Sequence, residues 1–142
     1  ANIVGPRGTQ GVSFDFIHKL KDDPSRREVL GNGRQEKSYM SAEDCVRAMC
    51  HIIDNGSGDV CLYNLGTGDT CSLRRIAEIL VEDSWREGVS IEYSGGDRGC
   101  AVEVPKTSLD VKRLLDSGFT PDMHSEEAIR HTARALISEI GL

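Results

Sequence analysis

Hydrophobic and polar positions along the chain change their spacing several times. Residues 11–21 place apolar side chains three and four positions apart, on one side of a predicted helix. The same spacing predicts four more helices, at residues 43–54, 73–80, 108–117 and 125–140. Helix boundaries are marked by residues that cap free backbone groups. The predicted amino-terminal caps are Ser41, either Thr70 or Ser72, Ser108 and Ser125, and Gly118 ends the fourth helix.

Strand patterns are shorter and lie between the helices. Residues 1–4 have the pattern of the end of a strand that enters a loop, and a short strand is predicted at 38–40. Residues 60–63 form an apolar run typical of a buried strand, and residues 89–93 alternate as a half-buried strand does. Helices dominate this order. It predicts a mixed α/β fold that contains no complete parallel sheet.

No internal repeat, low-complexity tract or proline-rich linker divides the chain, so residues 1–142 are predicted to form a single domain. Composition is ordinary for a globular protein, with 38% apolar and 28% charged residues. The net charge of −6 argues against a nucleic-acid partner. No apolar run is long enough to cross a bilayer, and there is no signal-peptide pattern, so no membrane partner is expected.

The cysteines and histidines do not suggest a metal site. Five cysteines form no CxxC pair, and no His/Cys spacing suggests zinc. We interpret them as small apolar side chains in a reducing environment, which predicts a cytoplasmic location. The four histidines fall on predicted helix surfaces or boundaries, with no persuasive Ser/His/Asp order. No catalytic or metal-binding residue is therefore assigned.

The remaining polar candidates are cations beside loops. Arg7 follows the first strand, Arg34 and Lys37 follow the Gly31-Asn32-Gly33 turn, and Arg98 lies in a glycine-rich loop. A diphosphate needs two or more cations or a bundle of backbone N–H donors, and arginine can bind phosphate in bidentate fashion. The alternative is that these side chains only solvate the surface. From the residues alone, the chain is an α/β module whose role stays open.

Six segments in order resemble the carboxy-terminal half of the extended short-chain dehydrogenase/reductase family, the NAD-dependent epimerase/dehydratase group related to UDP-glucose 4-epimerase. They span nearly the whole chain, and their order and spacing are typical of the family. The matching segments are ANIVGPRG at 1–8, LGNGRQEKSY at 30–39, EDCV at 43–46, YNLGTG at 63–68, DRG through EVP at 97–105, and SEEAI at 125–129.

The resemblance implies a substrate-binding region for a nucleotide-sugar, with a UDP-sugar first among the candidates. It places Asn2 by the sugar or its phosphate, Lys37 and Arg98 on the diphosphate, Tyr39 at the edge of the nucleotide pocket and Glu103 on the ribose. Lys37 stands where the family more often has Arg, and Glu103 where it has Asp. Asp44 is expected to cap its helix instead of contacting ligand.

The resemblance also implies functions that this sequence lacks. The family binds NAD on an amino-terminal Rossmann domain with a glycine fingerprint, and its catalytic pair is Tyr-x-x-x-Lys. Neither motif occurs here: Tyr39, Tyr63 and Tyr93 are not followed by Lys four positions on. We therefore expect a portion of a longer enzyme, not catalytic by itself and without NAD of its own. A stand-alone nucleotide-sugar-binding remnant and a protein-interaction module are the alternatives.

Removal from a Rossmann domain would expose apolar helix faces. The two helices expected to lose their packing surface are those at 11–21 and 43–54. The second of these carries Val46, Met49, Cys50 and Ile53 on its apolar face. Exposed apolar surface favours association, so the chain is expected to form homo-oligomers.

Overall fold

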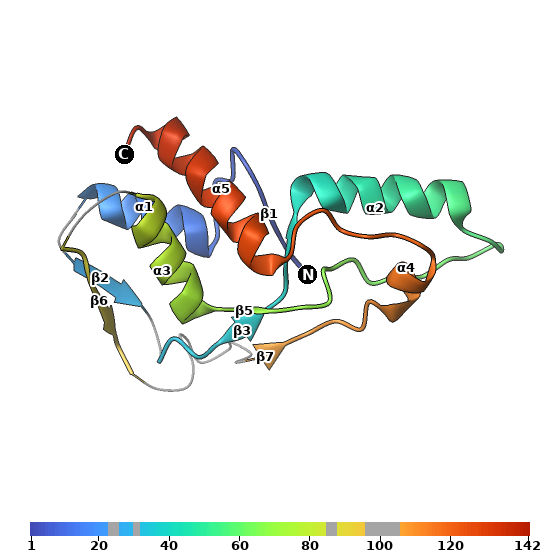
Figure 1. Cartoon of the computed structure of the whole chain (residues 1–142), viewed down its shortest axis with the longest axis horizontal. Coiled ribbons are helices and arrows are strands. Elements are labelled where there is room, and N and C mark those ends of the chain that lie inside the picture. The colour runs from blue at the N-terminus through green and yellow to red at the C-terminus, as the bar shows by residue number, and fades with distance from the viewer. Residues whose placement is uncertain (23–25, 30–31, 85–87, 96–105) are drawn as a thin grey trace.

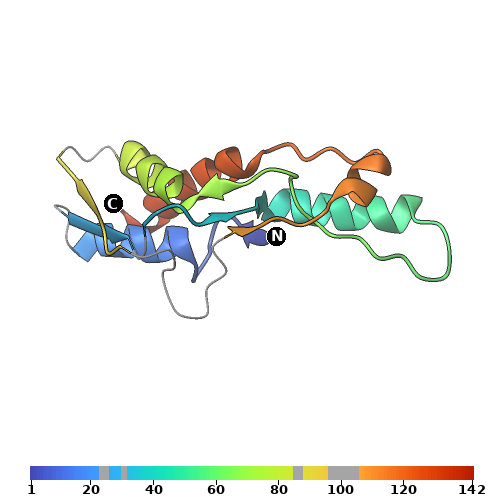
Figure 2. The same cartoon turned by 90° about the horizontal axis from the view of Figure 1, so that it is seen from below.

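The computed structural model describes residues 1–22, 26–29, 32–84, 88–95 and 106–142. Three helices gather at one end of an elongated molecule, and two lie at the other (Figures 1 and 2). The first group consists of α1 (Val12–Asp22), α3 (Leu73–Asp83) and α5 (Ser125–Ile140). The second consists of α2 (Ala42–Asn55) and α4 (Lys112–Asp116). All five predicted helices are therefore present, with α4 shorter than expected.

The strands form three small sheets. In the first, β1 (Asn2–Val4) runs parallel to β4 (Tyr39–Ser41), with Asn2 opposite Tyr39. In the second, β2 (Arg26–Val29) runs parallel to β6 (Ser90–Tyr93). In the third, β3 (Glu36–Lys37) lies between antiparallel β5 (Cys71–Ser72) and parallel β7 (Lys106–Thr107). Within the described residues no sheet exceeds three strands, which confirms an α/β fold without a complete Rossmann sheet.

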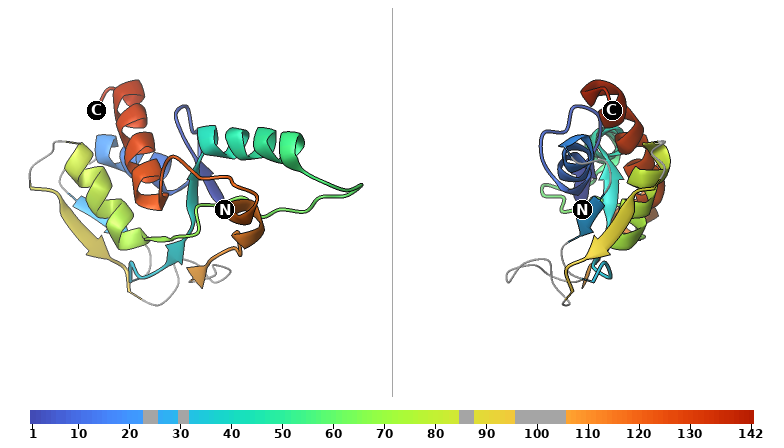
Figure 3. Two further views of the ribbon diagram at one scale, coloured as in Figure 1. Left: turned by 45° about the vertical axis from the view of Figure 1, so that its right-hand side comes forward. Right: turned by 90° about the vertical axis from the view of Figure 1, so that its left-hand side faces the viewer.

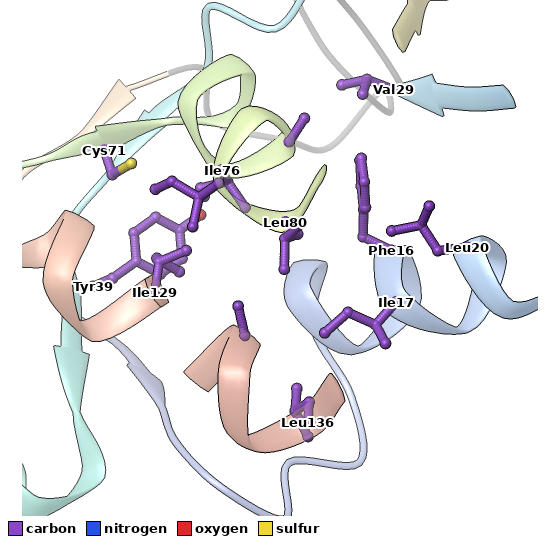
Figure 4. Close-up of a cluster of buried hydrophobic side chains, with 13 residues drawn as sticks. Phe16, Ile17, Leu20, Val29, Tyr39, Cys71, Ile76, Leu80, Ile129 and Leu136 are labelled. Carbon is purple, nitrogen blue, oxygen red and sulfur yellow. The ribbon is translucent and has the colours of Figure 1, made fainter. Parts of the chain in front are cut away.

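The main core lies between α1, α3 and α5. Their inner faces meet through fully or almost fully buried side chains, shown in Figure 4. These include Ile17 and Leu20 of α1, Ile76 and Leu80 of α3, and Ile129 and Leu136 of α5. The expectation that the helix at 11–21 loses its packing surface is wrong, because α1 buries its apolar face against α3 and α5 within this chain.

The α2 helix differs, because its apolar face is exposed. Val46, Met49 and Ile53 are 59%, 49% and 79% exposed, and Cys50 is exposed too. The opposite side of α2 is buried over a second, smaller core that includes Met40, Leu114 and Phe119. In Figure 3, α2 extends away from the three-helix group. The expectation of an uncovered apolar face therefore holds for α2.

Two cap predictions are confirmed and two are wrong. Ser41 caps α2 by accepting from the Asp44 N–H at 3.0 Å, and Ser72 caps α3 by accepting from the Arg75 N–H at 3.1 Å. Ser125 is instead the first residue of α5, because its hydroxyl is drawn inward by buried polar partners. Ser108 does not cap α4, which begins at Lys112; the Asp110 side chain accepts from the Lys112 N–H there.

Some of the strand predictions are confirmed, and one is wrong. The strand expected at 38–40 is found as β4, and that at 89–93 as β6. The prediction of a strand at 60–63 is wrong. This segment forms no strand and pairs with none of the described strands, and Val60 and Leu62 are 78% and 75% exposed. An apolar run becomes a buried strand only where a neighbouring strand and a covering layer exist; among the described residues no strand pairs with this segment, and of its side chains Tyr63 packs against the smaller core.

Candidate functional site

A cavity of about 510 Å³ opens between β1, the loop that follows it, the start of α1 and the inner side of α5. Asn2, Lys37 and Tyr39 all line it. Asn2 of β1 lies opposite Tyr39 of β4 in one parallel sheet, and Lys37 of β3 lies two residues before Tyr39 along the chain. The structure thus gathers the three predicted ligand residues that it describes. Arg98 and Glu103 lie outside the described residues.

Asn2 is fixed by the backbone next to the cavity. Its side-chain amide donates to the Ser38 carbonyl at 3.1 Å, and its backbone N–H donates to the same oxygen at 3.0 Å. Ser38 lies between Lys37 and Tyr39, so this pair of bonds ties β1 to the segment that carries both other residues. The Asn2 side chain therefore has a defined orientation at the exposed end of the cavity wall.

Lys37 brings positive charge to the cavity. It is half-buried in β3, whose other residue, Glu36, pairs with Lys106 of β7 at 2.7 Å. The hydrogen bond and the charge of Lys106 lower the pKa of Glu36, so its carboxylate stays ionised and engaged with Lys106. Among the described residues that line the cavity, none is an aspartate or a glutamate. The cavity therefore favours an anionic ligand.

Tyr39 is a wall residue whose ring belongs mainly to the core. The residue is 7% exposed, and Figure 4 shows its ring beside Ile76 and Ile129. Its backbone N–H donates to the Ser125 hydroxyl at 3.0 Å. Tyr39 thus connects the cavity to the packing between β4 and α5, and its position depends on that core.

A chain of hydrogen-bonded polar side chains contacts the backbone of Tyr39. Ser38 Oγ lies 3.2 Å from Thr67 Oγ1, which lies 3.0 Å from Ser125 Oγ. Ser125 in turn donates from its hydroxyl to Asp69 at 2.9 Å. Burial opposes ionisation of Asp69, but hydrogen bonds from Thr67 and Ser125 outweigh it, so the pKa of this carboxyl lies below its ordinary value. The network joins the YNLGTG segment at 63–68 to the strand and helix beside the cavity.

The other candidates from the sequence do not line the cavity. Arg7 and Arg34 are exposed and do not line it. Arg7 adopts a left-handed backbone with φ of 58°, and its N–H donates to the Glu139 carboxylate. Asp44 is structural, as expected, but not as a helix cap. Its carboxylate, 1% exposed, accepts from the backbone of Asp122 and Met123.

The sequence interpretation missed the contribution of the 8–14 segment. Gly8, Gln10 and Gly11 line the cavity together with the first turn of α1. The signal in the sequence is Gly11-Val12-Ser13, a glycine followed by a helix start, which is common in proteins and carries no specific motif.

No group of three or more His, Cys, Asp or Glu side chains in the described ranges is placed to hold a metal ion. None of the described helices has the length and apolar character needed to cross a membrane.

Comparison with known proteins gives matches along the chain. Residues 1–66 match the sequence model of the NAD dependent epimerase/dehydratase family. GDP-mannose 3,5-epimerase 1 of Oryza sativa subsp. indica is 25% identical over 136 residues, which cover 92% of this chain and 34% of that protein. dTDP-glucose 4,6-dehydratase of Streptomyces griseus is 28% identical over 137 residues, 93% of this chain and 39% of the relative.

A solved structure extends the comparison to the fold. A crystal structure of UDP-galactose 4-epimerase superposes with a TM-score of 0.82 and 31% identity, over 99% of this chain and 44% of that chain. The chain therefore spans less than half the length of this structure and little more than a third of the two curated relatives.

Proposed function

Since the chain resembles the NAD-dependent epimerase/dehydratase family in both sequence and fold, we propose that it is the nucleotide-sugar-binding portion of such an enzyme. The observation that carries this proposal is the meeting of Asn2, Lys37 and Tyr39 on the wall of one cavity. Asn2 and Tyr39 lie 37 positions apart in the chain and are brought opposite each other by the pairing of β1 with β4, while Lys37 lies two positions before Tyr39.

The cavity has the size and charge that such a ligand needs. Its volume of about 510 Å³ lies in the range of small-molecule sites, about 300–1,000 Å³. Lys37 brings positive charge to the wall, whose described residues include no aspartate or glutamate, and Asn2 supplies a polar group held in place by Ser38. A diphosphate between a nucleoside and a sugar matches this arrangement, because it carries negative charge and needs fixed polar partners.

The nucleotide is proposed to be UDP. The names of the similar proteins point to UDP-galactose, GDP-mannose and dTDP-glucose, which share a diphosphate and differ in base and sugar. We favour UDP over the other two nucleotides because the UDP-galactose 4-epimerase is 31% identical over almost the whole of this chain. We further propose that Arg98 is a second diphosphate cation and that Glu103 binds the ribose, as the family resemblance implies.

Catalysis would require groups that these 142 residues do not supply. Hydride transfer in the family uses NAD, and the sequence has neither the glycine fingerprint that holds a dinucleotide nor Tyr-x-x-x-Lys. The residues present therefore do not fit NAD. The role proposed for this chain is to bind and orient the nucleotide-sugar, with cofactor and acid/base groups supplied from outside these residues.

Calorimetric titration tests the proposal. UDP-galactose, GDP-mannose and dTDP-glucose are titrated into the 142-residue chain and into Lys37→Ala, Lys37→Arg and Lys106→Ala. We expect UDP-galactose to bind most tightly, Lys37→Ala to weaken it about ten-fold through loss of a charge-assisted contact, and Lys37→Arg to preserve binding.

Lys106→Ala is the matched control, because Lys106 is a neighbouring lysine that pairs with Glu36 and does not line the cavity. The affinity of Lys106→Ala for UDP-galactose should equal that of the unsubstituted chain. Equal affinities for Lys37→Ala and the unsubstituted chain would refute the assignment of this cavity as the ligand site.

The alternative function, an interaction module, is favoured by the exposed face of α2 formed by Val46, Met49 and Ile53. We propose that this face binds a second copy of the chain, since monomers rarely leave such a contiguous apolar stripe uncovered. Ile53→Glu should lower the weight-average mass in sedimentation equilibrium. Asp54→Ala, at the exposed neighbouring position, should leave it unchanged. A monomeric parent chain at high concentration would contradict self-association.

A further inference from the structure

One side of α2 carries a narrow apolar stripe that nothing in the described part of the chain covers. Its members, all exposed, are Val46, Met49, Cys50 and Ile53. Because successive residues of a helix turn by about 100°, these four side chains lie within roughly 100° of arc, in one row along the helix. In Figures 1 and 3 the helix extends away from the three-helix group, so a second molecule can approach the stripe along its length.

The stripe is complementary to itself when two copies of α2 lie antiparallel. A two-fold axis between positions 49 and 50 sets Val46 of one copy opposite Ile53 of the other. The same axis sets Met49 opposite Cys50, so the long, flexible thioether side chain packs over a small one. A closed dimer uses the same surface on both of its copies, and this stripe meets that requirement.

Charges beside the stripe favour the antiparallel orientation over the parallel one. Arg47 and Asp54 are both exposed and lie on the same flank of the stripe. In the antiparallel pair, Arg47 of each copy lies near Asp54 of the other, whereas a parallel pair would bring like charges together. Arg47 also contacts Asp44 and Asp122 of its own chain and is 45% exposed. Exposed charge pairs add little affinity, so these charges select the orientation and the apolar stripe supplies the binding.

We propose that two copies of this chain pair through α2 in antiparallel orientation, with Met49 and Cys50 at the two-fold axis. The inference rests on the self-association proposed for this face and does not depend on nucleotide-sugar binding. The helix has 14 residues and is about 21 Å long. One pair of such helices buries less than about 1,200 Å², so the association is weak, with a Kd above about 1 μM.

The antiparallel pair fixes distances that disulfide formation can measure. With helix axes about 8–10 Å apart and Cα atoms about 2.3 Å from each axis, the Cα atoms of the two Cys50 residues lie about 5–7 Å apart. A disulfide needs about 4.4–6.8 Å. Two Val46 residues lie at opposite ends of the paired stripes, more than about 10 Å apart, and so do two Ile53 residues. Val46 of one copy is within disulfide reach of Ile53 of the other.

Oxidised glutathione supplies the oxidant for this measurement: two protein thiols form one disulfide while it is reduced to two glutathione thiols. All variants carry Cys61→Ser and Cys100→Ser, because Cys61 is only half-buried and Cys100 lies outside the described residues; Cys45 and Cys71 are buried. This background should form a dimer linked through Cys50, seen on non-reducing gels and identified by mass spectrometry of the linked peptides. Adding Cys50→Ser should abolish the linked dimer and leave the weight-average mass in sedimentation equilibrium unchanged.

The orientation is tested in the background that also carries Cys50→Ser. Val46→Cys alone and Ile53→Cys alone should each give little linked dimer. An equimolar mixture of the two variants should give at least about ten-fold more, because only the mixed pair has the required separation.

Three results would count against the proposal. Cross-linking of Val46→Cys alone or Ile53→Cys alone, as efficient as that of their mixture, would show a parallel pair. A dimer that Ile53→Glu dissociates but that forms none of the expected cross-links would overturn the antiparallel pairing and leave self-association standing. A monomer at roughly 1 mM would overturn both. Calorimetric titration of UDP-galactose tests the nucleotide-sugar function separately from all three.

Discussion

Asp44 offers a direct test of how the two ends of the molecule are held together. Its carboxylate is 1% exposed and accepts from the Asp122 N–H at 3.0 Å and from the Met123 N–H at 3.1 Å. Arg47 donates to the same carboxylate at 2.5 Å from one turn further along α2. Asp44 therefore anchors the segment that leads into α5, the helix that forms part of the cavity wall.

We predict that Asp44→Ala destabilises the chain by about 3 kcal/mol. Each backbone hydrogen bond to a charged acceptor contributes about 1.5–3 kcal/mol. The lower value applies to both, because Asp122 is exposed and Met123 is half-buried, so water can replace part of the loss. The Arg47 contact adds little, since Arg47 is 45% exposed and also reaches the exposed Asp122 carboxylate at 2.5 Å.

Urea unfolding followed by circular dichroism measures this difference, with Asp122→Ala as the matched control. That substitution keeps the Asp122 N–H and removes only its carboxylate, which is 68% exposed, so the free energy of unfolding should change by less than about 1 kcal/mol. Asp44→Asn should fall between the two, since the amide keeps an uncharged acceptor. A loss below about 1 kcal/mol for Asp44→Ala would refute the anchoring role.

Two further predictions concern a glycine and an acid-sensitive network. Gly33→Ala should lower the free energy of unfolding by about 2–4 kcal/mol in a urea titration, because φ is 74° and the added Cβ would lie 2.4 Å from Tyr93 Cε1. The control is Gly11→Ala, where φ is 95° but the space is open, and it should cost only about 1–2 kcal/mol in the same titration. The lowered pKa of Asp69 stabilises the fold above about pH 4, the pKa of an unfolded Asp, and this stabilisation is lost as pH falls through the folded value. Melting temperatures measured from pH 7 to pH 3 should therefore show Asp69→Asn less stable than the unsubstituted chain at pH 7 and close to it at pH 3. The same difference in melting temperature at every pH would contradict this.

The sequence by itself determined the helices, because their signals are local. Apolar spacing of three and four residues fixed which side of α1 and α3 would be buried. Ser41 could be recognised as a cap from its immediate neighbours, and Ser72 as one of two candidates beside Thr70. The family resemblance likewise depended on short segments read in order. It predicts Asn2, Lys37 and Tyr39 as ligand residues, and all three line one cavity of the structure.

Tertiary structure decided which of those local patterns became buried. Among the described residues no strand pairs with the apolar run at 60–63, so Val60 and Leu62 are exposed, and nothing described covers the apolar face of α2. Ser125 lost its predicted capping role because Asp69, 56 positions earlier in the chain, offered its hydroxyl a partly buried acceptor. Burial and hydrogen-bond partners are set by residues far apart in sequence, so periodicity and capping rules cannot determine them.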